Sequence, residues 1–185
     1  MAPTIIDLEG GRQPILNEDG SKVLTFNGEI YNFQEIKKDL LAAGHVFKTA
    51  TDSEVLLHGY EESGEKPLNK LRGMFAFVIW DKEKRELFGA RDFFGIKPLY
   101  YAQMGDTLMF GSEIKSFLHH PHFQKELNRP MLENYLSFQY APGPETFFKN
   151  VYKMPPAHSF LYKDGKMKLT RYWLPEFDAE EDKPL

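Results

Sequence analysis

The chain has 185 residues, 42% of them hydrophobic and 27% charged, which is typical of a single globular domain. Its net charge of −4 argues against a nucleic-acid-binding protein, because such proteins normally carry a basic face. Cysteine is absent, which excludes disulfides, cysteine-ligated metals and thiol catalysis by this chain. The longest apolar run, residues 74–80, is shorter than the roughly 20 residues of a membrane helix. We expect a cytoplasmic protein without a signal peptide and without a membrane or nucleic-acid partner.

The first third of the chain indicates strands followed by helices. Residues 23–26 are typical of a strand, and residues 29–32 are a candidate continuation of it beyond Asn27-Gly28. Asn32, with Glu35 three residues later, resembles a capping box for a helix that ends at Gly44. A short strand at residues 46–47 precedes a second helix, for which Thr51 and Asp52 are alternative caps.

The middle of the chain contains the most apolar strand. Residues 74–80 are apolar on both faces, which predicts a central strand buried on two sides. A charged turn separates it from a second strand over residues 86–91. Two hairpins are expected beyond it, one that pairs residues 99–103 with 108–111 and one that pairs 159–162 with 167–172 over the turn Asp164-Gly165. Two helices are expected between these hairpins, one at residues 112–119 and one from Pro130 to about Tyr140. Antiparallel hairpins with separate helices predict an α+β fold built in layers.

Asn27-Gly28 has two interpretations. Both residues tolerate positive φ, so the pair is typical of a tight hairpin turn. Alternatively, the Asn27 side-chain amide and the Gly28 backbone N–H form an oxyanion hole. The residues alone do not choose between them.

Carboxylates near this pair raise a second question. Asp52 either caps the following helix or pairs with a substrate ammonium, and Glu29 has the chemistry for the second role too. Two acids at one pocket would suit an amino-acid substrate.

Two further groups have structural interpretations. His119, His120 and His122 lack the spacing of a helical metal site, and we expect a polar helix end there. Arg91-Asp92 with the turn at residues 95–98 is either an anion site or a structural turn with an ion pair, and we favour the turn.

Five motifs follow one another along nearly the whole chain. They are FNGEIYN at 26–32, TDSEV at 51–55, LRGMFAF at 71–77 with Trp80-Asp81, RDFFGIKPLYY at 91–101 and SEIK at 112–115. Together they resemble the class II glutamine amidotransferase domain of glutamine-hydrolysing asparagine synthetases.

The resemblance implies an Ntn-hydrolase fold, a four-layer αββα sandwich. In that family an N-terminal cysteine attacks the glutamine side-chain amide, with its own α-amino group as base. The ammonia travels to a synthetase domain of the same chain, where ATP activates aspartate as an acyl adenylate. By position, Asn27 and Gly28 would form the oxyanion hole, and Glu29 and Asp52 would hold the α-amino group of glutamine. ATP and Mg²⁺ belong to the synthetase domain, so we expect no cofactor and no metal in this chain.

The departures from the family concern both ends. Ala2 stands where the family has its cysteine, and the RGPD segment is missing. Ala2-Pro3-Thr4 replaces an Arg-Leu-Ser stretch whose Arg binds the glutamine carboxylate, and the SGGxDS motif of the synthetase domain is absent. We therefore expect an incomplete amidotransferase domain over residues 1–175, lacking its first strands, and the start of a linker over residues 176–185. Unpaired strand edges would favour a homo-oligomer, with Ile5 and Ile6 as candidates for pairing with a partner's sheet.

The predicted function is that of a fragment from the glutaminase half of an asparagine synthetase. The parent would hydrolyse glutamine to glutamate and ammonia for ATP-dependent amidation of aspartate, and the fragment itself would be inactive. One alternative is the amidotransferase-like half of another amide-forming synthetase. A second is a non-catalytic scaffold that docks on a synthetase partner.

Overall fold

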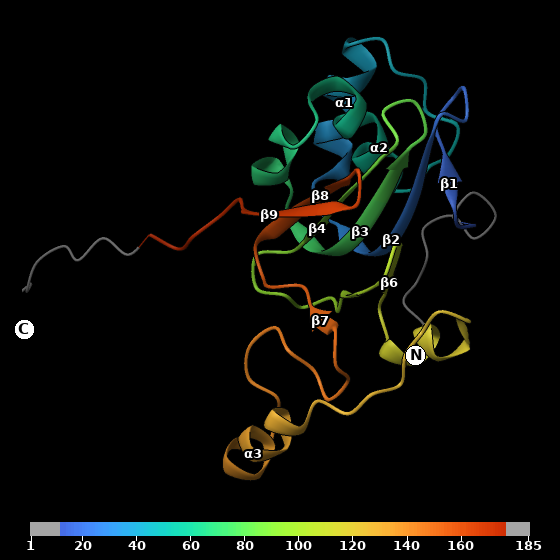
Figure 1. Ribbon diagram of the computed structural model, residues 1–185. Helices are drawn as coiled ribbons and strands as arrows, with labels where there is room; N and C mark the ends of the chain where they lie inside the picture. Colours follow the sequence, from blue (N-terminus) through green and yellow to red (C-terminus); the bar gives the residue numbers. More distant parts are fainter. Residues whose placement is uncertain (1–11, 177–185) are drawn as a thin grey trace, which may run out of the picture.

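The computed structural model describes residues 12–176, which form two antiparallel sheets and several helices (Figure 1). The larger sheet has, in spatial order, β1 (Ile15–Leu16), β2 (Lys22–Ile30), β3 (Gly73–Asp81), β4 (Glu86–Arg91), β8 (His158–Lys163) and β9 (Lys166–Arg171). The smaller sheet has β6 (Thr107–Gly111), β5 (Tyr100–Met104) and β7 (Val151–Lys153). The helices are α1 (Phe33–Ala42), α2 (Glu54–Ser63), α3 (Arg129–Phe138) and the 3₁₀ turns η1 (Lys66–Lys70) and η2 (Ile114–His119).

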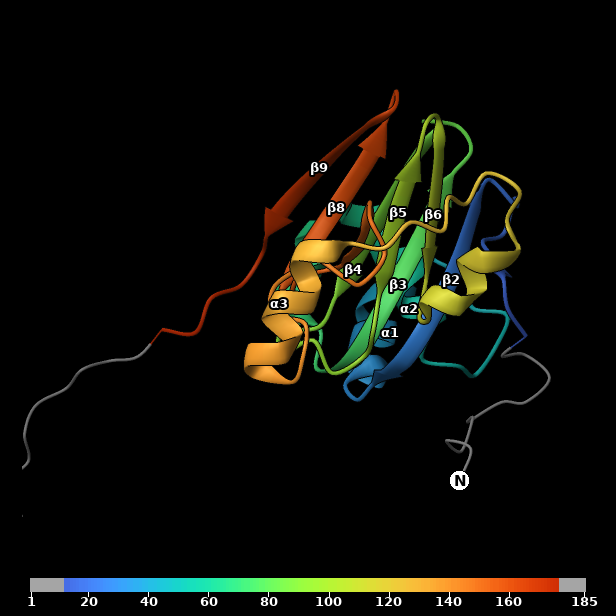
Figure 2. The ribbon, with the colours of Figure 1, turned by 60° about the horizontal axis from the view of Figure 1, so that its bottom comes forward.

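The two sheets are stacked between helical layers. Helices α1 and α2 cover one face of the larger sheet, and the smaller sheet lies against its other face (Figures 1 and 2). On the far side of the smaller sheet, Phe117 of η2 and Phe123 pack against Met104, Met109 and Val151. The predicted α+β fold with layers in the order αββα is confirmed. Ile5 and Ile6, which are the candidates for self-association, and residues 177–185 of the predicted linker lie outside the described residues. The absence of the first strands, the linker and the self-association therefore stay predictions.

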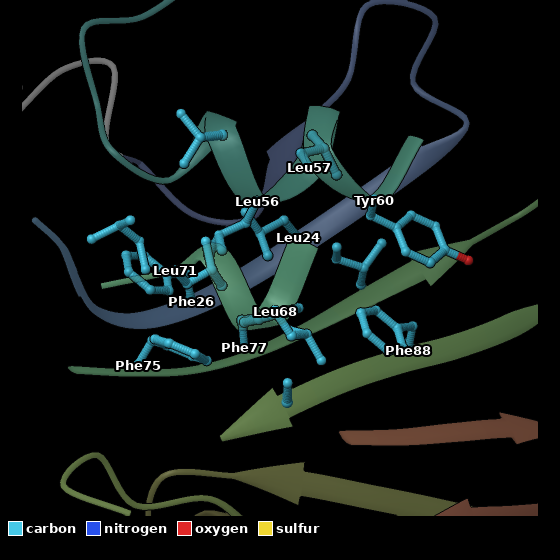
Figure 3. Close-up of a cluster of buried hydrophobic side chains, with 14 of the residues drawn as sticks. Leu24, Phe26, Leu56, Leu57, Tyr60, Leu68, Leu71, Phe75, Phe77 and Phe88 are labelled. Atoms are coloured by element: carbon cyan, nitrogen blue, oxygen red, sulfur yellow. The ribbon is translucent and has the colours of Figure 1, made fainter. Parts of the chain in front are cut away.

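Strand β3 occupies the centre of this stack. Its alternate side chains Phe75, Phe77 and Ile79 face the helices, where they join a large apolar cluster (Figure 3). Ala76 and Val78 point the other way, into the layer between the sheets. Side chains that alternate between two apolar environments explain why the sequence of this strand is apolar without interruption. The predicted central strand buried on both sides is therefore confirmed.

The hairpin interpretation of Asn27-Gly28 is wrong. Strand β2 runs without a break through both residues and pairs with β3 from Lys22 to Ile30. A Cβ on Gly28, which has a φ of +155°, would lie 2.0 Å from the Met74 carbonyl oxygen. Glycine is thus required by the close approach of two backbones, not by a turn.

The predicted helix caps and the short strand at residues 46–47 are also wrong. The Asn32 side chain bonds to the Lys70 carbonyl and the Arg72 N–H across the chain, so it does not cap α1. Ser53, not Thr51 or Asp52, precedes α2, and its side chain makes no cap hydrogen bond. Asn32 and Asp52 instead bond to segments 38 and 22 residues away, which local patterns do not reveal. Within residues 12–176, no helix has both the length and the apolar character that a bilayer span requires.

The layered core predicts a large loss of folding stability when one buried aromatic ring is removed. Phe88 is 2% exposed and stacks on Tyr60 at 5.2 Å between ring centroids. Phe88→Ala should lower the free energy of unfolding by about 3–5 kcal/mol in urea denaturation, because a cavity replaces the ring. Leu136→Ala, at an 82% exposed position of α3, is the control and should change it by less than about 0.5 kcal/mol. Similar losses for both variants would contradict the placement of Phe88 in the core.

Candidate active site

Among residues 12–176, the edge of β2 beyond β1 is met by side chains and not by another strand. β1 pairs only with Val23 and Leu24 of β2. Beyond that point, the Phe26 N–H donates to Oε1 of Gln13 at 2.7 Å, and Nε2 of Gln13 donates back to the Phe26 carbonyl at 2.5 Å. Further along, the Ile30 N–H donates to Oδ2 of Asp52 at 2.7 Å.

The backbone N–H of Gly28 points to this same edge. Residues two apart on a strand direct their N–H groups to the same side. Since those of Phe26 and Ile30 both reach outward to side chains, that of Gly28, between them, does so too. The opposite direction is taken by Tyr31, whose N–H donates to the Arg72 carbonyl on the β3 side at 2.7 Å. Gly28 therefore presents a backbone donor at the edge between Gln13 and Asp52.

Asn27 projects into a cavity between the sheets. The cavity has a volume of about 500 Å³, and its walls include Gln13, Thr25, Val78 and Phe110 as well as Asn27. Nδ2 of Asn27 donates to Oγ of Ser112 at 3.2 Å, which fixes the plane of the amide. An amide nitrogen carries two protons, so the second remains available to a ligand.

Asp52 is brought to the site by the segment that leads into α2. Burial of its carboxyl raises its pKa above the usual 3.8, and the nearby charge of Glu29 adds to the rise. The hydrogen bond from Ile30 acts in the opposite direction, because it favours the carboxylate. Asp52 and Glu29 therefore form a pair of acids close enough to repel, and a cation between them would relieve that repulsion.

The structure thus places all four predicted residues along one stretch of β2 and its edge. Asn27 and Gly28 offer two N–H donors, and Glu29 and Asp52 offer negative charge a short distance away. Donors and carboxylates at two ends of one site suit a ligand that carries both an amide carbonyl and an ammonium group.

Two neighbours of this site were missed by the sequence analysis. Gln13 brackets the Phe26 backbone, and Ser112 orients the Asn27 amide. Ser112 begins one of the five motifs, which was the available signal for it. Gln13 had no local signal, because its partner is 13 residues away.

The two remaining candidate groups are engaged in local structure. Asp92 accepts hydrogen bonds from the N–H groups of Ile96 and Lys97, and the Arg91 guanidinium donates to the carbonyls of Lys97, Met154 and Gly95. Arg91-Asp92 is a structural turn, as favoured, although both side chains bind backbone instead of each other. The backbone N–H of His122 donates to Nδ1 of His120, and Nδ1 of His122 forms a hydrogen bond with Oγ1 of Thr107.

Comparison with known proteins decides the family. A model of the glutamine amidotransferase domain matches residues 3–173. The chain belongs to this family. It is 44% identical over 184 residues to asparagine synthetase [glutamine-hydrolyzing] 1 of Bacillus subtilis, and 37% identical over 181 residues to asparagine synthetase [glutamine-hydrolyzing] 3 of the same organism. These alignments cover 97% and 96% of this chain but only 29% and 30% of the relatives.

Solved structures agree with this assignment. Glutamine phosphoribosylpyrophosphate amidotransferase from Bacillus subtilis superimposes with a TM-score of 0.61 at 26% identity, covering 88% of this chain and 32% of that one. A second structure, described as the allosteric regulatory enzyme of purine biosynthesis, gives 0.63 at 25% identity, covering 90% and 32%. The amidotransferase domain therefore has the expected Ntn-hydrolase type of sandwich.

The raised pKa of Asp52 predicts a pH-dependent gain in stability for Asp52→Asn. A carboxyl whose pKa is higher in the folded state binds protons more tightly there, so its stabilisation is complete below pH 3.8 and lost as pH rises through the folded pKa. Asparagine keeps the acceptor for Ile30 but removes the charge. The Asp52→Asn variant should thus have a higher free energy of unfolding than the unsubstituted chain at pH 7. In denaturation measurements, the difference should shrink towards pH 3.

Asp19 provides a control of opposite sign. Hydrogen bonds from Ser21 lower the pKa of Asp19. Asp19→Asn should therefore lose stability at pH 7 relative to acidic pH. Equal pH profiles for Asp52→Asn and the parent chain would contradict the burial of an unfavourable charge at Asp52.

Proposed function

We propose that this chain binds glutamine as the glutaminase domain of an asparagine synthetase. The observation that carries the proposal is the convergence of Asn27, Gly28, Glu29 and Asp52 along one edge of β2. In the proposed reaction, a cysteine thiolate attacks the side-chain amide carbon of glutamine, ammonia leaves, and water hydrolyses the thioester to glutamate.

Asn27 and Gly28 act on the developing oxyanion. Negative charge moves to the amide oxygen as the tetrahedral intermediate forms. The second proton of the Asn27 amide and the outward N–H of Gly28 are donors held in place before the reaction, the first by Ser112 and the second by the β2–β3 pairing. Donors that need no reorganisation stabilise the transition state more than they stabilise the substrate.

Glu29 and Asp52 act on the other end of the substrate. The α-ammonium group of glutamine supplies the positive charge that offsets their mutual repulsion. Because this group does not react, its contacts contribute to binding and orientation.

The relatives support asparagine as the final product of the larger enzyme. Three Bacillus subtilis proteins named as glutamine-hydrolysing asparagine synthetases are 44%, 37% and 41% identical to this chain. The synthetase half, with ATP, Mg²⁺ and aspartate as its ligands, is therefore the proposed partner of this domain. The rival readings, another amide-forming synthetase or a docking scaffold, lack a comparable observation in their favour.

The 185-residue chain by itself should release no ammonia from glutamine. It contains no cysteine, and the proposed chemistry needs a thiolate. A coupled glutamate dehydrogenase assay on the purified chain should match a buffer blank. Ammonia release above that blank, and lost in Asn27→Ala, would show that a different nucleophile acts at this site.

A chain extended at its N-terminus tests the individual roles. The added segment begins with a free cysteine and ends with the Arg-Leu-Ser stretch that the family resemblance implies, and it should produce glutaminase activity. Asn27→Ala should then lower kcat about 100- to 1000-fold, because one oxyanion donor is lost. Asp52→Asn should chiefly raise KM, since it removes charge from a contact with a non-reacting group.

The control for these variants is Asn134→Ala on α3, which should leave both constants unchanged. An Asn27→Ala variant with the parent's kcat and a native circular dichroism spectrum would remove Asn27 from the oxyanion hole. An unchanged KM in Asp52→Asn would likewise remove Asp52 from the ammonium site.

A further inference from the structure

A cluster of imidazole and carboxylate groups lies on the helical side of the larger sheet, apart from the four residues discussed above. Glu18 comes from the turn before β2, His45 from the segment after α1, and His58 from α2. One ligand atom from each of these three residues lies within 4.8 Å of the other two. Glu61, one turn further along α2, contacts both histidines.

The distances within the cluster suit a small divalent ion. Nδ1 of His58 lies 2.9 Å from Oε2 of Glu61 and 3.8 Å from Oε1 of Glu18, and Nδ1 of His45 lies 3.9 Å from Oε2 of Glu61. A tetrahedral zinc ion with bonds of about 2.0–2.1 Å needs neighbouring ligand atoms about 3.3 Å apart. These three separations bracket that value, and the ligand atoms of Glu18, His45 and His58 all lie within 4.8 Å of one another, so side-chain shifts of about 1 to 1.5 Å would complete the coordination.

The outward nitrogens of both histidines face further carboxylates. Nε2 of His45 lies 3.2 Å from Oε2 of Glu62, and Nε2 of His58 lies 4.0 Å from Oε1 of Glu54. Metal-bound histidines almost always donate their second ring N–H to such a group, which fixes the tautomer. His45 matches this arrangement, whereas Nε2 of His58 points toward Glu54 from beyond hydrogen-bond distance and would have to move about 1 Å closer to donate to it.

His58 is the most buried member of the cluster, and its Nδ1 lies 2.9 Å from Oε2 of Glu61. Its side chain is 1% exposed, and its Nε2 has no hydrogen-bond partner within the described part of the chain. With Nδ1 bonded to a metal, the ring proton must sit on Nε2, where it faces Glu54. The buried nitrogen would then carry a proton directed at a carboxylate instead of an uncompensated lone pair.

We propose that Glu18, His45, His58 and Glu61 bind one divalent transition ion of the zinc type. Two imidazoles and two carboxylates are a donor set that zinc accepts, and four protein ligands make a closed, structural site. Asn17 supports it from outside, because its Nδ2 donates to Oε1 of Glu61 at 2.6 Å and leaves Oε2 for the ion. Glu18 is the exposed member of the cluster, so the ion enters from the side of Glu18.

The site has a consequence for the neighbouring segment. His45 and His58 flank residues 46–57, which include Asp52. A bound ion holds both ends of that segment and ties them to the turn before β2. The ion is therefore a structural brace for the segment that carries Asp52, and its binding does not depend on the proposed glutaminase role.

The test is a Co²⁺ titration of the purified 185-residue chain after treatment with a chelator. We expect saturable binding of one equivalent, with visible absorption bands of a low-coordinate Co²⁺ site that Zn²⁺ abolishes by displacement. Zn²⁺ should also raise the melting temperature, because it binds the folded chain. In His45→Gln and in Glu18→Gln, each at a position that is not fully buried, the affinity for Co²⁺ should fall at least about tenfold.

His122→Gln is the matched control, because it removes a histidine from the separate group at residues 119–122. Its Co²⁺ affinity should equal that of the parent, and the circular dichroism spectra of all variants should agree. Absence of saturable binding in the parent, undiminished binding in His45→Gln, or loss of binding in His122→Gln would each overturn the proposal.

Discussion

The rest of the structure depends on the burial of β3 on both faces. This strand pairs with β2 on one side and β4 on the other, and its side chains enter two different apolar layers. Because its backbone groups are satisfied by its neighbours, the strand can be removed from water without leaving unpaired donors. It thereby fixes the position of β2, and with it the exact registry in which Asn27, Gly28 and Glu29 face Ala76, Phe75 and Met74.

At the edge of β2, the candidate site is built around backbone groups that have no hydrogen-bond partner in the sheet. A strand edge normally presents a row of free N–H and C=O groups that invite another strand. Here side chains satisfy part of the row, Gln13 at Phe26 and Asp52 at Ile30, and the N–H of Gly28 lies between them. The same Asp52 carboxylate that terminates the row is held partly buried near Glu29, an arrangement that costs stability when both groups are charged.

Helix α2 links the proposed glutamine site to the proposed metal site. Glu54 in its first turn binds the N–H groups of Lys48 and Thr49, which shapes the segment that carries Asp52. His58 and Glu61, one and two turns later, belong to the metal cluster. A single helix therefore positions both groups, and a change in its packing should affect them together.

The sequence by itself determined the layered α+β fold, the central strand, three strand pairs joined by short turns, and the family, while the roles of the four site residues stay predictions. These features depend on periodicity, turn residues and ordered motifs, which are local. Only the tertiary structure decided the role of Gly28, because the approach of the Met74 carbonyl is not a local property. The same holds for Asn32 and Asp52, whose caps were mispredicted because partners 38 and 22 residues away compete for their side chains. It holds most clearly for Glu18, His45 and His58, which have no recognisable spacing and meet only when the turn before β2 packs beside α2.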